Sequence, residues 1–229
     1  MKVILDQILF KKFNPHFKLV LISVKGMDNR NKAHESQHLV KETEKLIKLT
    51  FNKDNVKSHK LISPWAVAQQ DFGDEAIHYH TSVEHLIKKV IHNQDVSVSD
   101  TLTNLLNYVS LRHIIPLGVD DYDKLKGNVS FTVALGGEKV GLFHLLKKNT
   151  FYYHDKKGPI GTKFDYWKNP RTKLNKSSQN ALVHLEILPP ISDEDVNKII
   201  LKLKNLISGF CGGKVKVVVL SRRKRSVWI

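Results

Sequence analysis

The spacing of the apolar residues changes near residue 128, and this change constrains the fold more than any other feature of the sequence. Before it, apolar side chains recur mainly every three or four residues, which is the period of an α-helix. After it, Val129, Phe131, Val133 and Leu135 alternate with other residues, which is the period of a β-strand with one buried face. A chain with helices in its first half and strands in its second is predicted to be α+β.

Capping signals mark where several helices begin. Thr81 and Glu84 have the spacing of a capping box, in which the Thr81 hydroxyl accepts from the Glu84 amide and the Glu84 carboxylate accepts from the Thr81 amide. Ser63 before Pro64, and Ser192 before a run of acidic residues, are similar signals. The helices expected from these signals and from the apolar spacing cover residues 32–50, 64–72, 82–91, 100–113 and 193–208.

Other segments are typical of strands. The run Lys18–Val24 is almost entirely apolar and is closed by Gly26, which predicts a largely buried strand. Gly136 and Gly137 follow the alternating strand and predict a hairpin turn. The further strands expected are residues 139–145, 181–188 and 214–220.

The length and the absence of linkers favour one domain. No internal repeat or low-complexity segment divides the 229 residues, so we expect a single domain over residues 1–220. Residues 221–229 contain four consecutive cations and are expected to form a basic, solvated C-terminal tail. There is no apolar run of about 18 residues and no signal peptide pattern, so a cytoplasmic protein without membrane association is expected.

The chain is strongly basic. It has 37 lysines and arginines against 22 aspartates and glutamates, a formal net charge of +15. This balance favours a polyanionic partner, of which nucleic acid is the usual one. The alternative is a lysine-rich proteome that makes every protein basic, since most of these cations are dispersed along the chain.

Motifs for covalent or metal-assisted catalysis are absent from the sequence. There is no HExxH, no Walker A motif and no GxSxG elbow. His78 and His80 with His85 have the best metal-ligand spacing, but no cysteine or acidic residue accompanies them at motif spacing, so no metal site is predicted. Cys211 follows a helix and is expected to be a buried structural thiol. No cofactor is predicted.

Two polar clusters are candidates for a site. Asn104, Asn107 and Arg112 lie on an otherwise apolar helix, before a loop rich in acidic residues. Their alternative interpretation is helix capping and a turn. The second cluster combines the aromatic residues Phe164, Tyr166 and Trp167 with the cations Arg171 and Lys173. Aromatic rings among cations can stack on bases and hold phosphate, or they can simply cover a sheet edge.

Four motifs, taken in order, resemble the stand-alone form of the B3/B4 domain, which is the tRNA-binding and editing module of the phenylalanyl-tRNA synthetase β subunit. The resemblance extends from residue 1 to about residue 213. The motifs are Val24–Asp28; Ser63-Pro64 with Phe72-Gly73 and Ser82–Glu84; Asn107–Arg112 with Pro116–Gly118, Asp121–Asp123 and Gly127; and Arg171–Leu174 with Gln179–Ala181 and Glu186–Pro190.

The resemblance implies an α+β domain with a layered β/β/α fold. In the synthetase, this module removes tyrosine wrongly esterified to the tRNA for phenylalanine. It holds the amino acid in a pocket beside the 3′ adenosine and places a water molecule near the ester carbonyl. Such chemistry needs neither a covalent nucleophile nor a cofactor, and it depends on positioning and polarisation.

The resemblance also assigns roles to residues. It implies catalytic roles for Glu186 and Asn107. Where the synthetase motif has a histidine, this chain has Gly118, and where the synthetase has a pocket carboxylate, this chain has His184. Glu186 follows on the same face of the predicted strand and can replace that carboxylate. The substrate-binding residues implied are Asn104, Arg112, Gly118, Asp121, Phe164, Tyr166, Arg171, Thr172 and His184.

Two functions are therefore expected to compete. The first is a trans-acting hydrolase that deacylates mischarged aminoacyl-tRNA, with tRNA or another RNA as partner and a small aminoacyl group in the pocket. The second is a non-catalytic module that binds RNA or an amino acid and keeps the synthetase editing fold. Gly118 and His184 motivate the second, because they depart from the family pattern.

Overall fold

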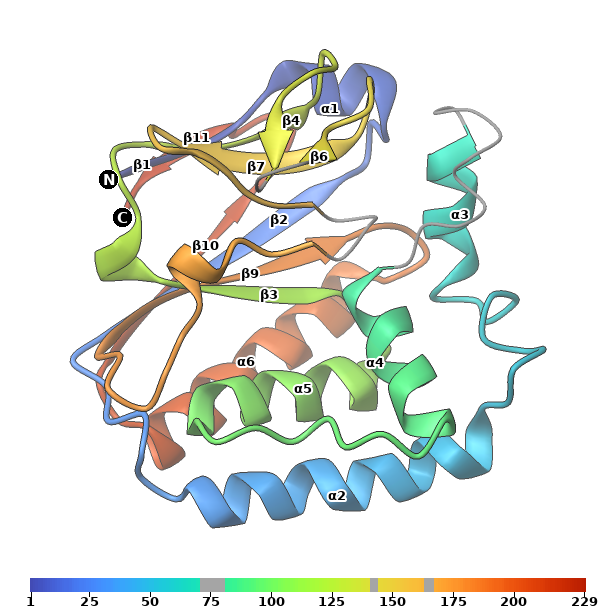
Figure 1. The fold of residues 1–229 in the computed structure, drawn as a ribbon, viewed down its shortest axis with the longest axis vertical. Coiled ribbons are helices and arrows are strands. Elements are labelled where there is room, and N and C mark those ends of the chain that lie inside the picture. The colour runs from blue at the N-terminus through green and yellow to red at the C-terminus, as the bar shows by residue number, and fades with distance from the viewer. Residues whose placement is uncertain (71–80, 141–143, 163–166) are drawn as a thin grey trace.

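The structure is a computed structural model, and it describes residues 1–70, 81–140, 144–162 and 167–229. Its described elements form three layers: a five-stranded sheet, a four-stranded sheet and a layer of helices (Figure 1). This is the predicted α+β class with the β/β/α layering. The helices are α1 (Gln7–Lys12), α2 (Ala33–Thr50), α3 (Ser63–Gln70), α4 (Ser82–Ile91), α5 (Thr101–His113) and α6 (Asp193–Phe210).

The four-stranded sheet lies in the middle of the molecule. Its strands, in spatial order, are β10 (Lys214–Leu220), β2 (Lys18–Lys25), β9 (Asn180–Ile187) and β3 (Leu117–Asp121). All neighbouring pairs in this sheet are antiparallel. Because β2 and β9 are covered on both faces, their sequences are apolar runs rather than alternating ones.

The five-stranded sheet forms one outer layer. Its strands, in spatial order, are β11 (Ser226–Trp228), β1 (Lys2–Leu5), β4 (Val129–Val133), β7 (Phe151–Asp155) and β8 (Gly158–Thr162). The inward-facing residues of this sheet, such as Phe131 and Phe151, pack on Leu19 and Leu21 of β2. One hydrophobic core thus fills the space between the two sheets.

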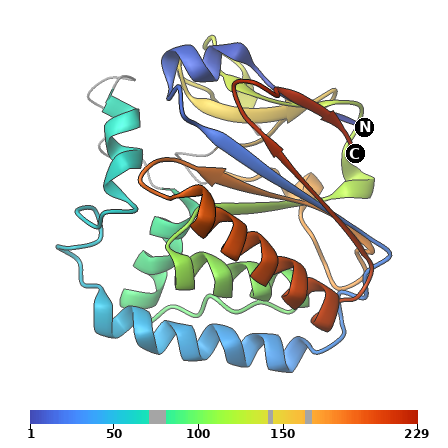
Figure 2. The same ribbon diagram turned by 180° about the vertical axis from the view of Figure 1, so that it is seen from behind.

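A second core joins the middle sheet to the helices. Val20, Ile22 and Val24 point away from the first core and pack against the apolar stripes of α5 and α6. Helices α2 and α4 then cover the outer side of α5 (Figure 2). Among the described residues, no helix has the length and apolar character required to span a bilayer.

Most predicted helices are confirmed within two residues. The Thr81 hydroxyl accepts from the Glu84 amide, as the capping box predicts. The Glu84 carboxylate, in turn, lies 3.0 Å from the Lys88 ammonium. Helix α6 ends at Phe210, two residues later than the predicted end at residue 208, because the chain first turns at Gly212, whose φ is +66°. The predicted end of the short helix at Phe72 and Gly73 lies outside the described residues.

The predicted hairpin at Gly136 and Gly137 is wrong in its pairing. Strand β4 pairs with β1 and β7, so both of its edges are already occupied. The segment that follows forms a separate two-stranded sheet of β5 (Lys139–Val140) and β6 (His144–Leu145). Leu135, expected on the buried face, is 78% exposed, because the strand ends at Val133.

Residues 221–229 do not form a solvated tail throughout. Ser221 and Lys224 close a tight turn through two backbone hydrogen bonds of 2.9 and 3.1 Å. Strand β11 follows and pairs antiparallel with β1. The four cations of the turn, residues 222–225, are exposed, so the solvated part of this segment is its basic side chains.

Candidate functional site

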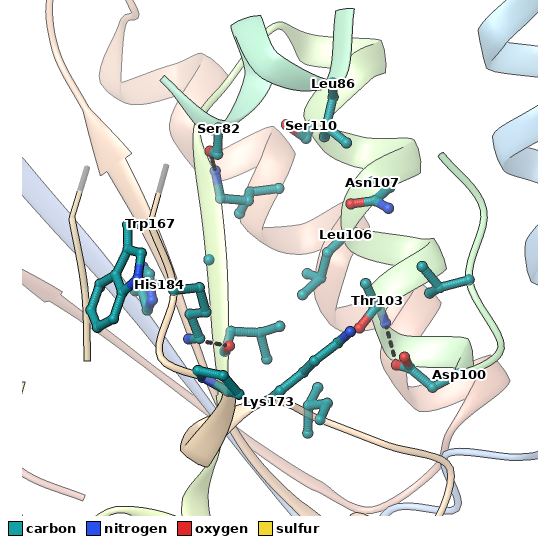
Figure 3. A pocket seen from close by; sticks show the side chains of 18 of the residues that line it. Ser82, Leu86, Asp100, Thr103, Leu106, Asn107, Ser110, Trp167, Lys173 and His184 are labelled. Carbon is teal, nitrogen blue, oxygen red and sulfur yellow. Dashed lines mark hydrogen bonds between the residues drawn. The ribbon is translucent and has the colours of Figure 1, made fainter. Parts of the chain in front are cut away.

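A cavity of about 730 Å³ opens between α5 and the edge strand β3 (Figure 3). Helix α5 supplies one wall, and β3 with the end of β8 supplies the other. The N-terminus of α4 closes one end, where the Ser82 hydroxyl accepts from the Leu117 amide at 3.1 Å. The segment 167–175 closes the other. The lining side chains used below are Asn107 on α5, Tyr153 on β7, Trp167, Lys168 and Lys173 on the closing segment, and His184 on β9.

The His184 ring depends on the glycine opposite it. Gly118 on β3 is the register partner of His184 on β9. A Cβ atom at position 118 would lie 1.9 Å from His184 Cε1, far inside contact distance. The ring also packs edge-on against Phe131 and Tyr153, at centroid distances of 5.6 and 5.1 Å. Gly118 therefore makes the space that lets a buried imidazole form part of the cavity wall.

His184 lies between two buried carboxylates. Its Nδ1 is 2.7 Å from Glu186 Oε1, and its Nε2 is 3.5 Å from Asp120 Oδ2. Glu186 is only 1% exposed and does not line the cavity. The imidazole therefore stands between this carboxylate and any molecule in the cavity.

Asp120 is further bound by a lysine and a tyrosine. The Tyr153 hydroxyl donates to Asp120 Oδ2 at 3.0 Å, and the Lys168 ammonium donates to Asp120 Oδ1 and, at 2.8 Å, to the Tyr153 hydroxyl. Burial by itself raises the pKa of Asp120, but the Lys168 charge and the His184 ring outweigh it and hold that pKa below its ordinary value. Asp120 is thus an anion that balances cationic or proton-donating groups beside the cavity.

Lys173 is a second cation of the cavity wall and, unlike Lys168, it is not bound to a carboxylate among the described residues. Its side chain is exposed and extends across the cavity toward Thr103 (Figure 3). In the part of the chain that the structure describes, its ammonium has no ion-pair partner. Trp167 lies on the same closing segment and is half-buried. The cavity therefore offers an ammonium group without an ion-pair partner among the described residues, together with an indole ring, a combination suited to an anionic, aromatic ligand.

Comparison with known protein families identifies the chain. The model of the B3/4 domain matches residues 70–205, which is more than half of the sequence. The chain belongs to the B3/4 domain family.

A solved structure is also similar to this B3/4 domain. It is an N-terminal fragment of the phenylalanyl-tRNA synthetase β subunit from Pyrococcus horikoshii, with 11% sequence identity and a TM-score of 0.42. The match covers 93% of this chain and 49% of that one, so the B3/4 domain described here spans about half the length of the fragment. No curated protein matches the chain.

The structure brings together three of the site residues predicted from sequence. Asn107, Gly118 and His184 all line the cavity of the B3/4 domain, on α5, β3 and β9. The Asn107 amide donates to the Val96 carbonyl at 2.8 Å, which fixes its side chain. Phe164 and Tyr166 lie outside the described residues.

Other predicted residues have different surroundings. Asn104 is buried inside α5 and bonds to the Ser36 hydroxyl and to the Val98 backbone, so it fixes the preceding loop, while Asp100 caps the helix. Asp121 accepts from the Ser178 hydroxyl at 2.7 Å. Thr172 is buried outside the cavity lining, and Arg112 is exposed on α5. None of these four lines the cavity.

Arg171 is held by a carboxylate away from the cavity. Its guanidinium donates to both oxygens of the buried Asp155, at 3.0 Å each, and to the Lys124 carbonyl at 3.2 Å. The same carboxylate also accepts from the Lys126 and Lys157 amides. Arg171 therefore fixes the middle of the closing segment to the five-stranded sheet.

Two further features of the sequence concern metal and thiol chemistry, the closely spaced histidines and the cysteine. His78 and His80 lie outside the described residues, and the residues that the structure does describe contain no group of three metal-ligating side chains. Cys211 is buried as predicted, and burial raises the pKa of its thiol to about 12. The thiol is therefore protonated at neutral pH.

Sequence reasoning missed Lys168 and Tyr153. Tyr153 is an inward-facing residue of β7, indistinguishable in the pattern from the core residues Phe131 and Phe151. Lys168 is one of many dispersed lysines. No local signal could have connected either of them with Asp120, because the residues meet only when the two sheets pack together.

Proposed function

We propose that this B3/4 domain binds tRNA and hydrolyses the ester of a mischarged aminoacyl-tRNA in trans. The observation that carries the proposal is the cavity beside β3, with an imidazole in its wall and a carboxylate behind that imidazole. A volume of about 730 Å³ is within the range of small-molecule sites and has room for an aminoacyl group with part of the terminal adenosine.

His184 acts as the general base. A carboxylate bound to one ring nitrogen fixes the orientation of an imidazole and stabilises its charged form, as in other hydrolases. Here Glu186 Oε1 bonds to His184 Nδ1. Glu186 thus acts through His184 as a positioning residue, and His184 accepts the proton of the attacking water through Nε2 once the substrate shifts that nitrogen away from Asp120.

Asn107 supplies a polarising group on the opposite wall. Its amide nitrogen carries two N–H groups, and one of them donates to the Val96 carbonyl. The second can donate to the ester carbonyl, where negative charge develops during attack. Because the first bond holds the side chain in place, little reorganisation is needed when the substrate binds.

Lys173 and Trp167 bind the RNA end of the substrate. The Lys173 ammonium pairs with a phosphate of the 3′ terminus, and the Trp167 indole stacks on a base. The net charge of +15 supports contact with further phosphates. A protein with this substrate would act in the cytoplasm, where aminoacyl-tRNA is used.

A specific observation favours the second candidate, a module that binds RNA or an amino acid without hydrolysis. His184 is fully buried, and its Nε2 faces Asp120 at 3.5 Å. If this arrangement persists with a ligand bound, the ring is a structural partner of two carboxylates and no base is available.

Deacylation assays separate the two candidates. The purified chain is incubated with tyrosyl-tRNA for phenylalanine and then with other mischarged tRNAs, and the loss of the ester is followed. The hydrolase is supported if one substrate is deacylated specifically and Lys173→Ala raises KM about fivefold with little change in kcat, the effect of a binding contact. The binding module is supported if no ester is lost while tRNA binds with a log–log salt slope near −3 to −4, as about five phosphates would give.

A further inference from the structure

The outer face of the five-stranded sheet is open to solvent. The helices α2, α4, α5 and α6 lie on the far side of the other sheet (Figures 1 and 2). The alternation along the strands directs one set of side chains outward, and we call this set the open sheet face. It consists of Lys2, Ile4, Asn128, Ser130, Thr132, His154, Ser226 and Trp228, all of them half-buried or exposed.

The strand register places these side chains in rows. Ser226, Ile4, Ser130 and His154 are successive cross-strand partners on β11, β1, β4 and β7. Neighbouring strands are about 4.8 Å apart, so this row extends about 14 Å. Toward β8 the face ends at Tyr152, which is covered by Leu146. The open sheet face is therefore mostly polar, with hydroxyl, amide and imidazole groups along it.

An exposed tryptophan stands at the edge of this face. Trp228 on β11 is 67% exposed and lies opposite Lys2 on β1. Its strand neighbour Val227 points inward and packs on the core, so the indole points outward. An exposed indole on a polar sheet beside a lysine offers a surface on which a base can stack.

The basic turn adjoins the same face. It consists of residues 222–225, all exposed cations, and none of them has an ion-pair partner in the described part of the chain. Backbone hydrogen bonds hold the turn: Ser221 and Lys224 bond to each other, and the Arg225 carbonyl accepts from the Leu5 amide at 2.7 Å. The neighbouring acidic residue is Asp6, and its carboxylate accepts hydrogen bonds from the Thr132 hydroxyl and the Ile8 amide.

We propose that the open sheet face and the basic turn together bind single-stranded RNA. Sheets with exposed aromatic rings bind unpaired bases by stacking, and cations alongside bind the phosphates. A membrane surface is a poorer match, since interfacial binding needs several protruding apolar side chains and the face has one indole among polar groups. This surface lies mostly outside the residues of the family match and does not require hydrolysis in the cavity.

Fluorescence anisotropy with a labelled 12-nucleotide single-stranded oligoribonucleotide tests the proposal on the full chain. We expect Trp228→Ala to weaken binding about tenfold and Trp228→Phe to weaken it less than threefold, because the phenyl ring still stacks. Changing all four cations of the turn to alanine should reduce the log–log salt slope by about 2 to 3, at about 0.7 for each phosphate that is no longer neutralised.

A matched charge control is available on the helical side. Lys48, Lys53, Lys60 and Lys204 are exposed there, and changing all four to alanine removes the same charge. We expect this variant to keep most of its affinity and its salt slope. Circular dichroism checks that each variant folds, and Trp228, being exposed, can be changed without opening the core.

Three results would overturn the proposal. They are unchanged binding by Trp228→Ala, an equal loss in both four-cation variants, and binding to phosphatidylserine vesicles in place of the oligonucleotide. Deacylation by the wild-type chain is measured in parallel. If the wild-type chain binds the oligonucleotide but hydrolyses nothing, the function proposed for the cavity fails and the surface proposal stands.

Discussion

The segment from Trp167 to Lys173 carries cations to two buried carboxylates, and the two pairs differ in what surrounds them. Arg171 binds Asp155 in a bidentate pair whose other side-chain hydrogen bonds are all to the backbone, namely to the Lys126 and Lys157 amides and the Lys124 carbonyl. Lys168 binds Asp120, whose other neighbours are the Tyr153 hydroxyl and the His184 ring. Neither Arg171 nor Asp155 lines the cavity. Lys168 does line it, and so does His184, the ring next to Asp120.

This difference shows that a buried ion pair does not by itself mark a functional site. Asp155 has all its bonds within a closed structural junction, so changing it alters stability and little else. Asp120 is linked to a titratable ring that faces a cavity, so changing it alters both stability and chemistry. The family resemblance implied a binding role for Arg171, which follows aromatic residues in the sequence, and it implied none for Lys168.

The largest effect is expected from breaking the structural pair. Arg171→Ala leaves the buried Asp155 carboxylate without its guanidinium, and we expect the free energy of unfolding to fall by about 3 kcal/mol. Urea denaturation measures it. The hydrolytic rate of the protein that remains folded should stay near the wild-type rate. If Arg171→Ala is as stable as the wild type but loses activity, the Arg171–Asp155 pair serves the reaction and is not a structural pair.

A smaller effect is expected where the ring meets the glycine. Gly118→Ala places a methyl group inside the space of the His184 ring, and overpacking of this kind costs about 1–3 kcal/mol of stability. His184→Ala should restore part of that loss, since the clash is removed. A double-mutant cycle by urea denaturation measures the coupling. Additive effects of the two substitutions would show that the ring and residue 118 do not compete for the same space.

The smallest effect is expected in how the free energy of unfolding depends on pH, through Asp120. Because the folded pKa of Asp120 lies below its unfolded value of about 3.9, its ionised form stabilises the fold above that pH, and the contribution is lost as pH falls through the folded pKa. Asp120→Asn should therefore flatten the fall in unfolding free energy between pH 5 and 3. The same fall in the variant as in the wild type would mean that Asp120 is not held ionised by Lys168 and His184.

The fold was largely predictable from local signals. Caps at Thr81 and Ser192 and the apolar run of β2 predicted elements close to the observed ones, because each depends on residues adjacent in sequence. The pairing of β4 was not predictable from Gly136 and Gly137. Its partners β1 and β7 are set by the packing of the two sheets, and a turn-forming dipeptide carries no information about occupied strand edges.

The site was predictable only in part. Asn107 and Gly118 could be located because they lie within recognisable motifs, and His184 because it lies between two such motifs. Glu186 was expected to project into the pocket because it lies on the same strand face as His184, yet the structure places it behind the ring. Sequence indicates the face of a strand but not the depth of a side chain in a layered core, and that depth determines which group reaches a ligand.

The rate of ester hydrolysis by His184→Ala at saturating aminoacyl-tRNA, compared with that of Arg112→Ala, tests the central claim most directly. Both residues were candidates by sequence, but only His184 lines the cavity, and Arg112 is exposed outside it. The account predicts a fall of about a hundredfold for His184→Ala, typical of a lost general base, and a rate within about twofold of wild type for Arg112→Ala. A wild-type rate for His184→Ala, or an equal fall in both variants, would contradict it.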